Sequence, residues 1–313
     1  MPSLRLALTT GDPAGIGPEV TVAAAHTLAQ EQPEIALDVF ADPAAVAPYG
    51  ALPATAQLHA LPCAAPPIPG QPDPRNGAYV SGLIEAAVAH VQAGKAQALV
   101  TAPLAKSVLY ESGFAFPGHT EFLGHLAGGL ETHMMLASEA LRVVPVTLHQ
   151  SLKSAIEDLG PAKIIAAARA AHEALRSQFG IAEPRLAVCG LNPHAGENGT
   201  MGREDEDVVR PAVEALRAEG IRIRGPLPAD TLFHAGARAT YDCVLGMYHD
   251  QVLIPIKALA FDSAVNVTLG LPFVRTSPDH GTAFDIAGQG KADPSSMLAA
   301  MRLAIRLVSN PGA

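Results

Sequence analysis

The sequence has few cysteines and no long apolar run, and these absences exclude two classes of protein. Its three cysteines, Cys63, Cys189 and Cys243, are an odd number without C-x-x-C spacing, and the last two lie in apolar segments. Buried thiols in a reducing compartment are therefore expected rather than disulfides. No 18-residue apolar segment is present, and the first residues lead directly into a strand pattern. We therefore expect a cytoplasmic protein that does not span a membrane.

Charged residues are also scarce. They make up 16% of the 313 residues, whereas hydrophobic residues make up 49%, which is typical of a globular protein with a large core. The formal net charge of −9 provides no general attraction to nucleic acid or to an anionic membrane. An anionic substrate would therefore have to be held by a few placed lysines, arginines or helix N-termini.

The glycine fingerprint of Rossmann-type dinucleotide sites is absent too. The turn after the first apolar run contains Gly15-x-Gly17 but lacks the third glycine. Further along the chain, strand patterns alternate with helical patterns. The strand patterns span residues 4–9, 35–40, 96–101, 141–148, 185–190 and 243–248, and the helical ones 77–93, 161–177, 204–218 and 294–308. This alternation predicts an α/β protein with mainly parallel strands.

Three histidines follow the ends of predicted strands. His149, His194 and His249 each come directly after an apolar run, at the place where ligands bind in open α/β sheets. A single histidine at a strand end is more often a hydrogen-bonded loop residue than a metal ligand. Three of them, however, indicate neutral imidazoles that converge on one divalent cation, with coordination positions left open for a substrate.

Other polar residues are candidates for ligand binding. Lys257 and Arg275 lie in segments otherwise too apolar for ordinary surface, which favours recognition of an anion. His119 and Thr120 lie in a turn that enters a helix, where both side chains can hydrogen-bond a ligand.

Four separated motifs and a glycine-rich C-terminal segment resemble a known family. The motifs are TGDPAGIGPE at residues 10–19, GHTEF at 118–122, LNPHAGE at 191–197 and MYHDQ at 247–251, and the segment spans residues 279–290. They resemble the 4-hydroxythreonine-4-phosphate dehydrogenases of pyridoxal phosphate biosynthesis over essentially the whole chain. Residues 15–20 and 280–288 are also similar to the isocitrate/isopropylmalate dehydrogenase group, which holds a nicotinamide cofactor without a Rossmann fold.

The resemblance implies two α/β domains with mainly parallel sheets and a cleft between them, as in isopropylmalate dehydrogenase. The first domain would comprise residues 1–115 and 282–313, and the second residues 116–281. The protein would be a homodimer whose site is completed by the second subunit. By the same resemblance, His149, His194 and His249 would bind the metal. The substrate ligands would be His119, Thr120, Lys257, Asn266 and Arg275, and Gly281, Thr282 and Asp285 would contact NAD or NADP.

The implied reaction is oxidation of 4-phosphooxy-L-threonine at C3, followed by decarboxylation to 3-amino-2-oxopropyl phosphate. One divalent ion, which would be zinc, magnesium, cobalt or manganese, would acidify the C3 hydroxyl and polarise the ketone that forms. Lys257, Asp230 or a water on the metal would serve as the base. Phosphate binding would position C3 against the nicotinamide.

Other functions remain open from the sequence alone. A related dehydrogenase would act on threonate or erythronate 4-phosphate instead. A metal-dependent hydrolase would use the same histidines to activate water, but it would leave the 280–290 segment unexplained. A non-catalytic protein that binds a phosphorylated ligand would leave the three histidines unexplained.

Overall fold

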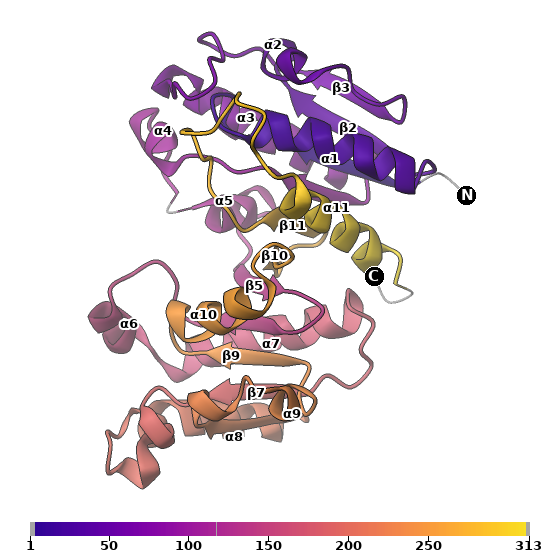
Figure 1. Cartoon of the computed structure of the whole chain (residues 1–313). Coiled ribbons are helices and arrows are strands. Elements are labelled where there is room, and N and C mark those ends of the chain that lie inside the picture. The colour runs from indigo at the N-terminus through magenta and orange to yellow at the C-terminus, as the bar shows by residue number, and fades with distance from the viewer. Residues whose placement is uncertain (1–3, 117, 311–313) are drawn as a thin grey trace. The chain divides into compact units, whose positions relative to one another are not determined.

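The computed structural model describes residues 4–116 and 118–310 (Figure 1). The chain divides into two compact units. Unit 1 contains the residues up to Glu131 together with Val265–Ser309, and unit 2 contains Thr132–Ala264 together with Asn310. None of the helices in the described part of the chain is long and apolar enough to cross a membrane.

Unit 1 is built on a sheet with the strand order β3-β2-β1-β4-β11-β10. All neighbouring strands run parallel except β10 and β11, which are antiparallel. Its strands are β1 (Arg5–Thr9), β2 (Ala36–Ala41), β3 (Ala56–Ala60), β4 (Ala98–Thr101), β10 (Val265–Leu269) and β11 (Val274–Pro278). Its helices are α1 (Gly17–Glu31), α2 (Pro43–Val46), α3 (Gly77–Gln92), α4 (Lys106–Glu111), α5 (His119–Leu126) and α11 (Ser295–Val308).

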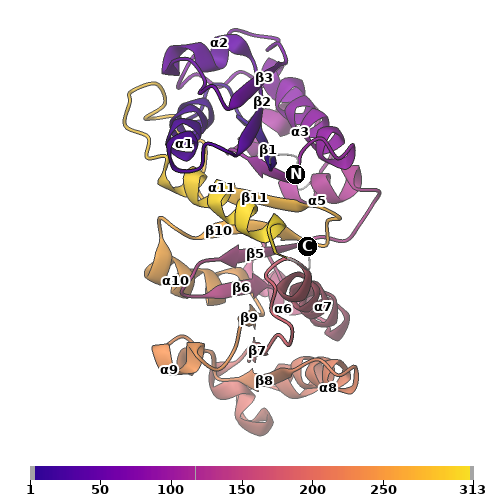
Figure 2. The ribbon, with the colours of Figure 1, turned by 90° about the vertical axis from the view of Figure 1, so that its right-hand side faces the viewer.

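Helices cover both faces of this sheet. Figure 2 shows α1 and α11 on one face and α3 and α5 on the other. On the second face, Val80 and Leu83 of α3 pack in one buried cluster with Leu99 of β4 and with Phe122 and Leu123 of α5. The central strands are buried on both sides, which explains their nearly continuous apolar sequences.

Unit 2 is also a sheet covered by helices on both faces, and its strand order is β5-β6-β9-β7-β8. Only the β5–β6 pair is antiparallel. Its strands are β5 (His133–Ala137), β6 (Arg142–Pro145), β7 (Leu186–Cys189), β8 (Ile223–Leu227) and β9 (Cys243–Gly246). Its helices are α6 (Leu152–Asp158), α7 (Pro161–Ser177), α8 (Arg210–Ala218), α9 (Ala235–Arg238) and α10 (His249–Ala260). In Figure 2, α7 and α8 lie on one face of this sheet and α9 and α10 on the other.

The elements agree with the sequence where apolar runs are long, and differ elsewhere. The predicted helix at 161–177 is α7, with the same bounds. The strand predicted over 141–148 ends at Pro145, and the helix predicted from residue 204 begins as a π-helical turn, Asp205–Val209, before α8. Among the strands, the sequence did not predict β3, β5, β8, β10 or β11, and among the helices it missed α10. The last of these contains an internal proline, Pro255.

The two units divide the chain at residues 131/132 and 264/265, whereas the sequence placed the boundaries at 115/116 and 281/282. Packing accounts for the difference. Helix α5 buries Phe122 and Leu123 in the core of unit 1. Strand β11 pairs with β4, and β10 pairs with β11. His119, Asn266 and Arg275 therefore belong to unit 1.

The turn between β1 and α1 depends on a glycine at position 11. Gly11 has a φ of +69°, and a Cβ atom there would lie 2.1 Å from the backbone oxygen of Pro103. This close approach lets the amide of Asp12 donate to the same oxygen at 3.0 Å. The glycine therefore fixes the turn against the end of β4.

We expect Gly11→Ala to lower the free energy of unfolding by about 1–3 kcal/mol more than Gly94→Ala does. Gly94 has nearly the same φ, +70°, but nothing lies within 4 Å of a Cβ placed there. The Gly94 variant therefore measures the backbone penalty alone, about 1–2 kcal/mol. Urea unfolding followed by circular dichroism compares the two. Equal losses would show that the contact with Pro103 does not constrain the turn.

Candidate active site

Three adjacent parallel strands in unit 2 end beside the three candidate histidines. Strand β9 pairs in parallel with β6 on one side and with β7 on the other. His149 follows β6, His194 follows β7, and His249 is the first residue of α10, directly after β9. Because the carboxyl ends of parallel strands share one edge of a sheet, the topology brings the three histidines to the same edge.

His149 and His249 lie close together. Their ring centroids are 5.5 Å apart, and the Nδ1 atom of His249 is 2.7 Å from a carboxylate oxygen of Asp250. When His249 is neutral, this bond places the proton on Nδ1 and leaves Nε2 free to bind a metal. His149 is exposed and His249 is partly buried.

Two open hollows border this edge. His149 and His249 line one of about 480 Å³, and His194 lines a second of about 590 Å³. Tyr248 and Asp250 line both hollows, so the three imidazoles flank adjoining spaces. Within residues 4–116 and 118–310, these histidines do not form a compact ligand triad; the one group of that kind lies in unit 1.

Two side chains join the strand ends that carry the histidines. The amide nitrogen of Gln251 donates to the backbone oxygen of Gly190, after β7, at 2.7 Å. Its amide oxygen accepts from the backbone N–H of Met247, after β9, also at 2.7 Å. Thr147, after β6, donates its hydroxyl to the backbone oxygen of Met247 at 2.8 Å. Gln251 is the last residue of the MYHDQ motif, but nothing in the local sequence of Gln251 or Thr147 indicates these bridging hydrogen bonds.

His194 lies in a backbone turn of unusual conformation. Five consecutive residues, 194–198, have φ between 43° and 74°, and four of them are not glycine. Asp205, which is fully buried, accepts from the backbone N–H groups of Leu191 and Asn192 at 2.7 and 3.0 Å. Strained backbone of this kind persists only where its surroundings hold it, and it concentrates at functional sites.

In unit 1, Arg275 of β11 is a buried cation without a carboxylate partner in the described parts of the chain. It is 2% exposed and donates to the hydroxyls of Thr268 and Thr101, at 2.9 and 2.5 Å. Burial lowers the pKa of its guanidinium to about 9. A buried charge is costly unless it is paired, and an anionic ligand would offset this cost.

The neighbours of Arg275 also present unused polar atoms. The Nδ1 atom of His119 lies 3.2 Å from the guanidinium and accepts from it, so its proton is on Nε2. Burial, followed by the Arg275 charge, lowers the pKa of His119 well below its usual value, and the ring is neutral near pH 7. Among the described residues, the Nε2 atom of His119, the Nε atom of Arg275 and the Oδ1 atom of Asn266 are buried without a hydrogen-bond partner. Thr120 is the second residue of α5, next to His119.

The first and last motifs of the chain meet in unit 1. The backbone N–H of Ile16 donates to the backbone oxygen of Thr282 at 2.9 Å, and Gly15 packs against the same residue. Thr282 is buried, whereas Gly281 and Asp285 are exposed beside it. The Oδ2 atom of Asp12 and the Nε2 atom of His280 are buried and have no hydrogen-bond partner in the described part of the chain. These orphaned polar atoms fit a polar ligand bound at the junction of the two segments.

The two candidate bases lie in different surroundings. Asp230 is exposed and lines the same hollow as His194. Lys257 is partly buried on α10, the helix that begins with His249.

Comparison with known proteins identifies the relatives of this chain. The family model for the pyridoxal phosphate biosynthetic protein PdxA matches residues 16–304. A 4-hydroxythreonine-4-phosphate dehydrogenase from Methylorubrum populi is 52% identical, with 98% of this chain and 95% of the relative covered. The crystal structure of the enzyme of that name from Klebsiella pneumoniae is 38% identical, covers 98% of this chain and 100% of the other, and superposes with a TM-score of 0.87.

More distant structures share the fold. The isocitrate dehydrogenase of Methylococcus capsulatus is 14% identical over 98% of this chain and 86% of its own, with a TM-score of 0.52. At that identity the likeness concerns the fold alone. The α/β class and the likeness to the isocitrate/isopropylmalate dehydrogenase fold, both predicted from the sequence, are confirmed.

We expect Arg275→Met to leave the free energy of unfolding unchanged or to raise it. Methionine fills a similar volume without a buried charge, and replacing buried charges by apolar residues is often neutral or stabilising by about 1–4 kcal/mol. Urea unfolding of the ligand-free protein measures the change. A loss of about 3 kcal/mol or more would mean that Arg275 is there for structural reasons. Leu99→Ala, at the position paired with Arg275 on β4, is the control for ordinary core damage and should cost about 2–5 kcal/mol.

Proposed function

The chain belongs to the PdxA family, and from this premise we propose that it oxidises 4-phosphooxy-L-threonine at C3 with NAD and a divalent metal ion. The resemblance drawn from the four motifs is confirmed, and the chain is an oxidoreductase of pyridoxal phosphate biosynthesis. The product after decarboxylation is 3-amino-2-oxopropyl phosphate. The observation that carries the metal-dependent mechanism is the placement of three histidines after the adjacent strands β6, β9 and β7.

We propose that His149, His194 and His249 hold the metal. Three neutral imidazoles suit zinc, cobalt or manganese, and they leave coordination positions open. A divalent ion held by these histidines would acidify the substrate hydroxyl and polarise the ketone that oxidation produces. Asp250 supports this assignment, because its hydrogen bond to Nδ1 of His249 leaves Nε2 as the ring nitrogen that can bind a metal.

The phosphorylated substrate is assigned to His119, Thr120, Lys257, Asn266 and Arg275. The buried guanidinium and the unpartnered atoms of His119 and Asn266 support this assignment. A phosphate oxygen can accept from Nε2 of His119 and from Nε of Arg275, donors that have no hydrogen-bond partner among residues 4–116 and 118–310. Because the net charge of the chain is −9, these placed cations must supply the attraction.

The reaction divides into two steps. In the first, a base would take the proton of the C3 hydroxyl, and the hydrogen bonded to C3 would pass to NAD as hydride, which gives a 2-amino-3-oxo acid and NADH. This β-keto acid then loses CO₂. Asp230, which lines the His194 hollow, and Lys257, on the helix that begins with His249, are the proposed bases. Either must lie within hydrogen-bond reach of the substrate hydroxyl in the bound state.

The nicotinamide cofactor is assigned to the loop that carries Gly281, Thr282 and Asp285. This loop adjoins the Gly11–Glu19 turn, where Asp12 and His280 present buried polar atoms without partners. NAD and NADP both remain compatible with this assignment.

Exposed apolar side chains and buried thiols support two further proposals, a homodimer and a cytoplasmic location. The apolar side chains of Ile254 and Leu259 on α10 and of Phe261 directly after it are 66%, 44% and 74% exposed, which supports a homodimer formed through this helix. All three cysteines are free, and burial raises the pKa of Cys189 and Cys243 to about 12. Inert thiols of this kind suit the reducing conditions of the cytoplasm.

We expect the metal-loaded protein to reduce NAD with 4-phosphooxy-L-threonine, and with a higher kcat/KM than with threonate or erythronate 4-phosphate. NADH absorbance measures all three substrates. Arg275→Met should weaken binding of the phosphorylated substrate by about 2–5 kcal/mol and leave NAD binding nearly unchanged.

The competing functions give different results in the same assay. Higher kcat/KM with a phosphorylated sugar acid would identify that compound as the substrate. Metal-dependent turnover without NAD would indicate a hydrolase. Equal losses of substrate and NAD binding in Arg275→Met would contradict its assignment to the phosphate.

We expect His149→Ala, His194→Ala and His249→Ala each to lose the metal and the activity while remaining folded. Gln251→Leu should keep the ligands but loosen the strand ends that carry two of them, and we expect a loss of metal affinity of about 10–100-fold. Isothermal titration with Zn²⁺ and Co²⁺ measures both effects.

Gln30→Leu, on the exposed surface of α1 in unit 1, is the matched control for Gln251→Leu and should bind metal like the unmodified chain. Full metal retention in two of the three histidine variants would refute the three-histidine site. Unchanged affinity in Gln251→Leu would mean that the strand ends do not need this bridge.

A further inference from the structure

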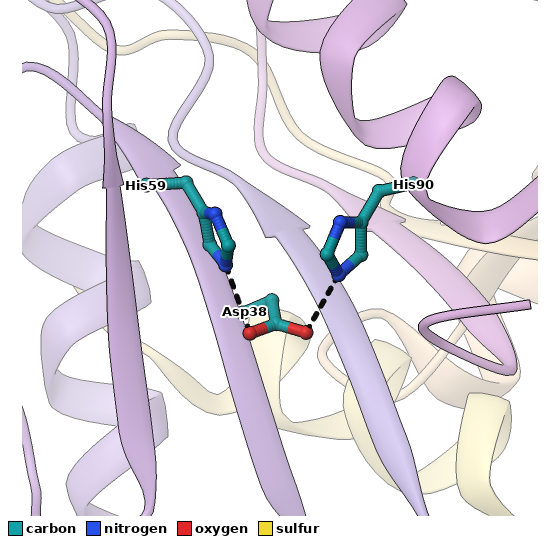
Figure 3. A group of neighbouring side chains, drawn as sticks. All are labelled: Asp38, His59 and His90. Carbon is teal, nitrogen blue, oxygen red and sulfur yellow. Dashed lines mark hydrogen bonds and ion pairs between the residues drawn. The ribbon is translucent and has the colours of Figure 1, made fainter. Parts of the chain in front are cut away.

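A second group of metal-ligating side chains lies in unit 1, outside the residues assigned above. Asp38 of β2 faces His59 of β3 and His90 of α3 (Figure 3). The Nε2 atom of His59 is 2.9 Å from one carboxylate oxygen of Asp38, and that of His90 is 2.8 Å from the other. One ligand atom from each residue lies within 4.8 Å of the other two.

The fold holds these side chains in place. In the β2–β3 register, His59 lies opposite Phe40, and Asp38 points to the same face as Phe40 because it is two residues earlier. Helix α3 covers that face. The His59 ring stacks on Phe40 with centroids 4.7 Å apart, and the His90 ring meets Phe40 edge-on at 5.4 Å. Packing thus orients both imidazoles before any ligand binds.

The carboxylate is buried while the histidines remain accessible. The side chains of Asp38, His59 and His90 are 2%, 27% and 13% exposed. Burial raises the pKa of Asp38, but the hydrogen bonds from His59, His90 and Arg5 outweigh it, so the pKa lies below its usual value. An ionised carboxylate with two imidazoles is therefore available at neutral pH, next to solvent that gives an ion access.

We propose that Asp38, His59 and His90 bind a divalent transition metal of the zinc class, at a site separate from the three-histidine site. Two imidazoles and one carboxylate are a donor set that zinc accepts, and water can complete the tetrahedron. Ligand distances of about 2.0–2.2 Å require that the rings move slightly apart around the ion. The ion would also displace the Nε2 protons that face Asp38, so each neutral ring would carry its proton on Nδ1.

The effect of removing Arg5 distinguishes a metal site from a cluster that is held by hydrogen bonds alone. Its guanidinium donates to the carboxylate oxygen that also faces His59, at 2.8 Å, and its side chain is 33% exposed. A neighbouring positive charge opposes a bound cation, yet it stabilises a carboxylate in the absence of metal. Removing Arg5 should therefore strengthen metal binding at a real site, whereas it should only destabilise a hydrogen-bonded cluster.

The test is a zinc titration of the full chain after removal of bound metal, with stoichiometry measured by elemental analysis. We expect His90→Gln and His59→Gln to lose one zinc equivalent, or to bind it at least about tenfold more weakly. Glutamine retains a hydrogen-bond donor toward Asp38 but is a poor zinc ligand, so both variants should fold. Arg5→Gln should bind this zinc more tightly than the unmodified chain.

The two metal sites are separable in this titration. His194→Ala should leave the Asp38 site intact, and His90→Gln should leave the three-histidine site intact. If His90→Gln and His59→Gln bind as much zinc as the unmodified chain, with the same affinity, the proposal is refuted and the cluster is held by hydrogen bonds alone. Weaker zinc binding in Arg5→Gln would refute it as well.

Discussion

The parallel pairing of β6, β9 and β7 is the constraint on which the candidate active site depends. Histidines 45 and 55 residues apart reach one edge only because three neighbouring strands run in the same direction. Thr147 and Gln251 then join the strand ends beyond the regular pairing, where side-chain bonds replace the sheet's own hydrogen bonds. A shift of one strand by a single residue would turn its side chains to the opposite face and separate the ligands.

The sequence predicts the buried parallel strands well and the functional strands poorly. β1, β4 and β7 are short apolar runs, and this pattern indicates a strand covered on both faces. β10 and β11 are buried as well, but they carry Asn266 and Arg275 in place of apolar residues. The polar side chains that we propose as substrate ligands therefore hide the apolar pattern by which such strands are predicted. Helix α10 was missed for a different reason, because Pro255 interrupts its helical pattern.

Candidate residues that stand in distinctive motifs were found from the sequence, whereas those defined only by tertiary packing were not. His119 lies in a turn that enters a helix, and His194 directly follows an apolar run; local sequence reveals both positions. Gln251 was visible as part of a motif, but its role depends on Gly190, 61 residues away. Asp38, His59 and His90 have no common spacing, and only the β2–β3 register and the docking of α3 bring them together.

The turn that carries His194 shows why such positions escape prediction. Left-handed backbone over five residues, four of them not glycine, is unfavourable for the isolated segment, at about 1–2 kcal/mol per non-glycine residue. Asp205 offsets part of that cost by accepting two backbone N–H groups just before the turn, and the backbone N–H of Met201 closes it on Gly196. The conformation is therefore set by a carboxylate that follows the turn in sequence and is buried beneath it. No local propensity at His194 contains this information, because the segment gains its shape only when β7 and the helical turn that carries Asp205 are already packed together.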